Sequence, residues 1–157
     1  MGQTIAEKIL SAHVDGEVQA GDLAEVQVDL VLANDITAPI SIREFERIGV
    51  GQVFDPDKIA LVPDHFAPNK DIKAAEQCKQ MHQFARSQEI TNYFQVGRMG
   101  IEHVLLPEQG LALPGDVIVG ADHYNGGSVD QGRAYVFHGS AVPNDVYLPW
   151  YVRPPGG

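Results

Sequence analysis

Apolar positions recur at helical and at β spacings in turn along the first part of the chain. Thr4 stands where an N-cap belongs for a helix through about Ser11, and Glu7 completes a capping box three residues later. After this helix, the segment EVQVDLVL alternates apolar and polar positions and is rich in valine, which predicts a strand at about residues 25–32. The chain is therefore expected to open with a short amphipathic helix followed by a strand.

The next helix and strand are marked by their bounding residues. Thr37 and Pro39 form a cap and first-turn pair for a helix that stops at Gly49. The segment DKIALVPDH is a short apolar run between polar residues, which is typical of a buried strand, and this strand ends at Pro63 and Asp64.

The longest predicted helix covers residues 70–88, with Asn69 as its cap. Its apolar positions keep a spacing of three to four residues and comprise Ile72, Ala75, Cys78, Met81, Phe84 and Ala85. Because Cys78 lies on this stripe, we expect it to be a buried thiol, whereas His82 is expected at the surface or lining a groove.

Strands continue to alternate with helices as far as residue 122. The segments TNYFQVG and GDVIVGAD are predicted strands, and GRMGIEHVLLPEQG between them carries one or two helical turns. This order predicts an α/β layer structure with a mostly parallel sheet. In such sheets the ligand site lies beyond the carboxyl ends of the strands.

The pattern changes from Tyr124 onward. A glycine-rich turn precedes one alternating strand at 133–138, and little regular structure is expected beyond about residue 141. We therefore divide the chain into an α/β segment at 1–122, a short β segment at 123–140 and an irregular tail at 141–157.

Composition and charge exclude several classes of partner. The 157 residues are 44% hydrophobic and 20% charged, which is typical of one globular domain with a tail. No apolar run approaches the length of a membrane span, and the N-terminus lacks the order of a signal peptide, so a cytoplasmic location without membrane association is expected. The net charge of −10 opposes binding to nucleic acid.

Polar residues that end the predicted strands are the first candidates for chemistry. They are Asn34 and Asp35, Asp64 and His65, and Asp122. Carboxylates, imidazoles and amides at strand ends suit a small, polar, acidic molecule. The alternatives are structural: a turn at Asn34 and Asp35, a loop cap at Asp64 and His65, and a core histidine at His103. A metal site built from Asp64, His65 and His103 is also conceivable, although these residues have no specific ligand spacing.

Five segments carry a resemblance to a known family. They are MGQTIAEKIL, DLVLANDITAP, FDPDKIALVPDHFAPNKDIKAAEQ, VGRMGIEHVLLPEQG and PGDVIVGAD. Through them, residues 1 to about 122 resemble the start of the large subunit in the 3-isopropylmalate dehydratases of the aconitase superfamily, more specifically the homoaconitase-like branch. The resemblance implies a partial aconitase-type α/β/α layer structure.

The same resemblance implies a hydro-lyase that isomerises 2-isopropylmalate to 3-isopropylmalate in leucine biosynthesis, or acts on a close relative such as homoaconitate. A separate small subunit supplies a serine base in this family, and a [4Fe–4S] cluster held by three cysteines acts as Lewis acid. By motif, Asp64 and His65 match the family's pair near the departing hydroxyl, and His103 matches a second active-site histidine. Substrate contacts are implied for Asn34, Asp35 and Asp122.

The sequence departs from the family after Asp122. His123, Tyr124 and Asn125 follow, where the family motif continues with serine, histidine and threonine. The only cysteine is Cys78, and one thiolate cannot anchor the cluster. We therefore expect that this chain binds no cluster and is catalytically incompetent alone.

Residues 116–140 resemble a second family, the FG-GAP repeat of integrin-type β-propellers. The words that carry this likeness are GDVIVGA and GRAYVFHGS. The calcium loop of many such repeats is absent. The resemblance predicts a chimeric or rearranged chain, and its functional alternative is a non-catalytic binding module. A lone blade cannot close a propeller, because each blade packs against its neighbours.

Overall fold

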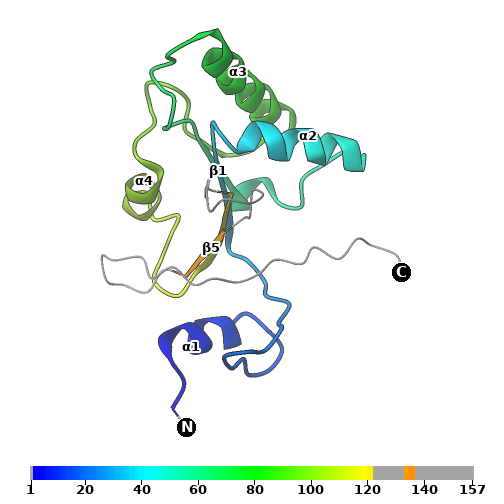
Figure 1. Ribbon diagram of the computed structural model, residues 1–157, viewed down its shortest axis with the longest axis vertical. Helices are drawn as coiled ribbons and strands as arrows, with labels where there is room; N and C mark the ends of the chain where they lie inside the picture. Colours follow the sequence, from blue (N-terminus) through cyan, green and yellow to red (C-terminus); the bar gives the residue numbers. More distant parts are fainter. Residues whose placement is uncertain (1, 122–132, 137–157) are drawn as a thin grey trace.

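The structure of the protein, a computed structural model, describes residues 2–121 and 133–136 (Figure 1). Its elements follow in the order α1 (Ile5–Ser11), β1 (Leu30–Asn34), α2 (Ala38–Ile48), the 3-10 turn η1 (Pro56–Lys58), β2 (Ile59–Val62), α3 (Ile72–Ser87), β3 (Asn92–Tyr93), α4 (Glu102–Glu108), β4 (Val117–Ala121) and β5 (Arg133–Val136). Strands and helices alternate as predicted, so the α/β class is confirmed.

The strands form one sheet in the order β3-β2-β1-β4-β5. The pairs among β1, β2, β3 and β4 are parallel, and β5 adds to the edge as an antiparallel strand. From β1 the chain moves to β2 and β3, and it then returns to the other side of β1 as β4. Such a reversal of strand order is a topological switch point, where α/β sheets open a crevice for ligands.

Helices cover both faces of the sheet, which confirms the predicted α/β/α layers. In Figure 1, α2 and α3 lie on one side of the strands and α4 lies on the other. The cluster under α2 and α3 consists of Ala33, Ala38, Ile42, Ile59, Leu61, Met81, Ala85 and Ile90. The cluster under α4 consists of Leu30, Leu32, Ala60, Val62, Leu106, Ala112 and Ile118. Because successive strand residues point to opposite faces and both faces are covered, β2 is apolar throughout and β1 is apolar up to its last residue, Asn34.

The N-terminal segment packs as a small unit beside the sheet. The predicted capping box of α1 is present, since Thr4 accepts from the Glu7 backbone and the Glu7 side chain accepts from the Thr4 backbone. Leu10 of α1 is buried with Val18 and with Val117 at the start of β4. This third cluster joins α1 to the edge of the parallel sheet.

The strand predicted at residues 25–32 is shifted in the structure to β1 (Leu30–Asn34). Val26 and Val28 pack against the third cluster. Asp29 then donates its backbone N–H to Val117 at 2.9 Å, directly before the ladder begins. The alternating pattern therefore indicates an extended segment that is buried on one side. Regular strand pairing begins only at Leu30.

The start of α3 also differs from the prediction. Asp71 caps this helix by accepting from the backbone of Ala74 at 2.8 Å, whereas Asn69 accepts from the Cys78 thiol. The buried face consists of Ala74, Cys78, Met81 and Ala85, so the predicted positions Ile72 and Ala75 face outward. The burial predicted for the Cys78 thiol is confirmed.

The predicted strand in TNYFQVG shortens to the two residues of β3, and the predicted turns of helix in GRMGIEHVLLPEQG are α4. Of the strand predicted at 133–138, residues 133–136 form β5. Residues 137 and 138, the glycine-rich turn and the tail at 141–157 lie outside the described residues. Within the described ranges, no helix combines the length and the apolarity that crossing a membrane requires.

Candidate functional site

Two of the predicted polar pairs meet at the carboxyl edge of the parallel strands. Asn34 is the last residue of β1 and lies opposite Val62, the last residue of β2. Asp35 follows the first strand, and Asp64 and His65 lie two and three residues beyond the second. Parallel pairing in this register brings the loops together, as the strand-end argument predicts.

Asn34 binds the backbone of the turn directly before α2. Its side-chain oxygen accepts from the N–H groups of Ile36 at 3.0 Å and Thr37 at 3.2 Å. The Thr37 hydroxyl also donates to this oxygen, and Thr37 makes no side-chain cap bond of its own. Thr37 therefore holds the predicted N-cap position of α2 without a side-chain cap bond, and Asn34, which is 1% exposed, folds the turn directly before it.

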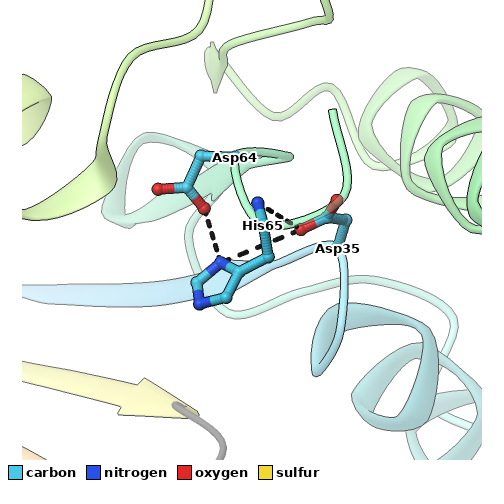
Figure 2. A group of neighbouring side chains, drawn as sticks. All are labelled: Asp35, Asp64 and His65. Atoms are coloured by element: carbon cyan, nitrogen blue, oxygen red, sulfur yellow. Dashed lines mark hydrogen bonds and ion pairs between the residues drawn. The ribbon is translucent and has the colours of Figure 1, made fainter. Parts of the chain in front are cut away.

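The carboxylate of Asp35 is enclosed by the loop after β2. Its residue exposure is 0%, and its Oδ1 and Oδ2 accept from the backbone N–H groups of His65 at 3.0 Å and Phe66 at 2.8 Å. The same Oδ1 lies 3.9 Å from His65 Nδ1. Figure 2 shows the Asp35 carboxylate directed at the backbone nitrogen and the ring of His65.

Asp64 and His65 form the closest side-chain pair of the site. Asp64 Oδ1 lies 2.7 Å from His65 Nδ1, and Asp64 Oδ2 accepts from the backbone N–H of Glu102 at 2.7 Å. With both oxygens of Asp64 acting as acceptors, Nδ1 is the protonated ring nitrogen. The second nitrogen, Nε2, points away from both carboxylates in Figure 2. The His65 side chain is 32% exposed, so the ring reaches the solvent side of a buried acidic cluster.

Glu102 is a site residue that the sequence reasoning did not identify. It is the first residue of α4 and 1% exposed, and its Oε1 accepts from the Asn34 amide at 3.3 Å. A glutamate in the first turn of a helix is ordinarily explained by the helix dipole, so the sequence offers no specific signal for this role. In the structure, Glu102 connects the end of β1 with the loop after β2.

His103 lies at the rim of the cluster. Its Nε2 is 3.5 Å from Glu102 Oε1, and its side chain is 43% exposed, so the reading of His103 as a core histidine is wrong. The possible metal ligands that lie within 4.8 Å of one another are Asp35, Asp64 and His65, and this group does not include His103. Asp122 lies outside the described residues.

The residues described do not fit a [4Fe–4S] cluster. Cys78 is the one cysteine of the sequence; it is buried on α3, and its thiol donates to the Asn69 side chain at 3.2 Å. Burial, reinforced by the negative charge of Asp35, raises the pKa of the Cys78 thiol. A cluster requires several thiolates, and the sequence has one cysteine to supply them.

The geometry suits proton transfer by His65. A histidine whose Nδ1–H is held by a carboxylate presents Nε2 as the nitrogen that gains and loses a proton. The Asp64 carboxylate stabilises the ring when it carries both protons, and Asp35 adds a second negative group nearby. The site can therefore act as general acid or general base towards a polar molecule at the sheet edge.

Comparison with known proteins gives a consistent match over the α/β segment. Residues 7–125 match the model of the aconitase family (aconitate hydratase). The 3-isopropylmalate dehydratase large subunit of Caldanaerobacter subterraneus subsp. tengcongensis is 64% identical over 124 residues, which are 79% of this chain and 30% of the relative. The large subunits of Thermodesulfovibrio yellowstonii and Moorella thermoacetica are 62% and 58% identical over 125 residues, again 79% of this chain and 30% of each relative. The chain thus spans about 30% of the length of these relatives.

Proposed function

Because the chain belongs to the aconitase family, we propose that its α/β segment provides part of the active site of a hydro-lyase that isomerises 2-isopropylmalate to 3-isopropylmalate in leucine biosynthesis. Identity of about 60% to several dehydratase large subunits supports this choice of substrate over homoaconitate. A dehydratase small subunit is the proposed partner, because the relatives are named as large subunits. A cytoplasmic location is part of the same proposal.

The observation that carries the proposal is the Asp64–His65 pair, with 2.7 Å between Oδ1 and Nδ1. In the dehydration direction, a base outside these residues, proposed to come from the small subunit, removes the proton from the adjacent carbon, and the C–H electrons form the C=C bond. As the C–O bond breaks, His65 Nε2–H donates its proton to the substrate hydroxyl, so that the hydroxyl leaves as water. Asp64 keeps the proton on Nδ1 and stabilises the imidazolium from which this transfer starts. Hydration runs the same transfer backwards, with His65 Nε2 accepting a proton from water.

The remaining predicted residues have supporting positions in the proposal. His103 is proposed as the second histidine that faces the substrate, and its exposure at the rim supports this role. Asn34 is proposed to shape the substrate side of the site, since it folds the turn before α2 and contacts Glu102. Asp122 is proposed to contact the substrate because it follows β4, the strand beside β1.

We further propose that the 157 residues do not catalyse the reaction alone. Their single thiol is buried and hydrogen-bonded, so the cluster typical of the full-length family has no anchor among them. The small dicarboxylate is nevertheless expected to interact with the His65 side of the site, because that side is exposed in this chain.

The test is a titration of the ¹⁵N-labelled chain with 2-isopropylmalate, followed by NMR. Signals of the His65 ring and of the amides around Glu102 should move in a saturable manner, whereas His13, which contacts Asp29 beside the third cluster, should not. The variant His65→Gln should remove the ring response and weaken the saturation. Equal shifts at His13 and His65, or none at either, would count against the proposed substrate site.

The second candidate is a binding module of the FG-GAP type. The antiparallel pairing of β4 with β5, from Val117 opposite Val136 to Gly120 opposite Arg133, favours it. However, β4 also pairs in parallel with β1, and propeller blades are antiparallel sheets. The parallel pairing therefore makes the hydro-lyase the stronger proposal.

A further inference from the structure

Asp35 is fully buried, and both of its carboxylate oxygens accept hydrogen bonds from two successive residues of another loop. The donors are the backbone N–H groups of His65 and Phe66, which are 30 and 31 residues away in the sequence. These two nitrogens flank the Cα atom of His65. Two successive N–H groups form a small concave site for a negative group, and one carboxylate fills it here.

The consequence is a fixed backbone at the histidine. Because the backbone N–H groups of His65 and Phe66 both donate to Asp35, this residue in the loop after β1 sets the direction of the His65 Cα–Cβ bond. Asp64 is tied separately, through its Oδ2, to the backbone of Glu102. The two members of the pair are thus held from opposite sides, by α4 and by the loop after β1.

Charge adds to this geometry. The His65 Nδ1 atom lies 2.7 Å from the Asp64 carboxylate and 3.9 Å from the Asp35 carboxylate. A proton on Nδ1 interacts favourably with both groups, whereas a proton on Nε2 alone leaves Nδ1 facing two acceptors. Both groups therefore favour the tautomer that presents Nε2 to a substrate.

We propose that Asp35 is a positioning residue of the Asp64–His65 pair: its buried carboxylate fixes the backbone at His65 and so holds Nδ1 at the Asp64 carboxylate, which selects the Nδ1–H tautomer. With 0% exposure, Asp35 acts through His65, and this indirect role takes the place of the substrate contact predicted from the sequence. The value of this tautomer for catalysis rests on the proposed function, whereas the positioning itself is a property of the chain.

The first measurement uses the unaltered chain, so that it does not depend on a variant that folds. NMR couplings across hydrogen bonds should connect the Asp35 side-chain carboxyl carbon with the amide nitrogens of His65 and Phe66. Long-range ring correlations should show the neutral His65 ring protonated at Nδ1. A neutral ring protonated at Nε2 would overturn the proposal.

The second measurement compares Asp35→Asn with Asp55→Asn. The first change keeps the size of the side chain but converts one acceptor into a donor, so exchange of the His65 and Phe66 amides should accelerate about 10- to 100-fold. The Nδ1–H tautomer should lose its dominance. Asp55 also accepts a backbone N–H, from Asp57 at 3.0 Å, and Asp55→Asn should leave the His65 ring unchanged.

An unchanged tautomer in folded Asp35→Asn would reduce Asp35 to a purely structural group and would refute the inference. Failure of the proposed function has a different signature. In that case, the tautomer and the amides respond to Asp35→Asn as described, but 2-isopropylmalate does not shift the His65 ring in the unaltered chain.

Discussion

Single residues in this chain are explained by which atoms accept and which donate. His13 is the clearest example outside the candidate site. Its Nδ1 faces the Ile9 carbonyl at 2.7 Å and its Nε2 faces the Asp29 carboxylate at 2.8 Å. Both partners are acceptors, so both bonds form together only when the ring carries two protons. His13 in this form joins α1 to the segment before β1.

This arrangement predicts a pH-dependent stability. The hydrogen bond to Ile9, together with the Asp29 carboxylate and the more distant Asp116, raises the pKa of His13 above its usual value despite the opposing effect of burial. The contribution of His13 to the free energy of unfolding is therefore fully present below about pH 6.5, which is the pKa expected for this histidine in the unfolded chain. It is lost as pH rises through the higher pKa of the native state. Urea midpoints should fall across that interval.

The variant His13→Gln isolates the residue responsible. It should be less stable than the unaltered chain on the acid side of the interval, and the difference should shrink as pH rises. An identical pH dependence of the urea midpoint in both proteins would mean that His13 does not contribute it.

Elements of the chain are set by apolar spacing, but their ends are set by polar contacts between loops. The spacing of α3 predicts its existence and the burial of Cys78, Met81 and Ala85, which the structure confirms. The cap predicted at Asn69 is wrong, because Asn69 and Asp71 are both good capping residues two positions apart and Asp71 caps the helix. A contact between residues distant in the sequence separates these two candidates. The Cys78 thiol donates to the Asn69 side chain, whereas Asp71 binds the helix backbone.

The corrected cap can be tested by a matched pair of substitutions. Asp71→Ala should lower the free energy of unfolding by about 0.5–2 kcal/mol, since the Ala74 N–H loses its partner at the start of α3. Asn69→Ala should cost less, because a thiol is a weak donor. Denaturant titrations of both variants measure the difference, and a greater loss for Asn69→Ala would restore the sequence-based assignment.

At the scale of the whole molecule, the strand-end rule predicts where the candidate site lies. The sequence places Asn34, Asp35, Asp64 and His65 at the carboxyl edge of a parallel sheet, and β1 and β2 bring them together there. Glu102 could not be predicted in the same way. Its role depends on how α4 crosses to the opposite face of the sheet, which places the Glu102 backbone at Asp64 and its side chain at Asn34.

The family membership and the site geometry lead to one account at this scale. The described sheet belongs to the aconitase family and carries the buried acidic cluster and the exposed His65 ring. The chain spans about 30% of the length of its dehydratase relatives. In the proposed reaction His65 donates a proton to the departing hydroxyl, and the base and the Lewis acid that the reaction also needs come from outside these residues.

The most direct measurement places residues 1–121 of this chain into the Caldanaerobacter large subunit, in place of the segment that is 64% identical, and follows isomerisation of 2-isopropylmalate with the small subunit present. The account predicts that the chimera is active, that His65→Gln within it lowers kcat by about 100- to 10,000-fold, and that the isolated 157-residue chain is inactive. An active chimera whose kcat is unaffected by His65→Gln would contradict it.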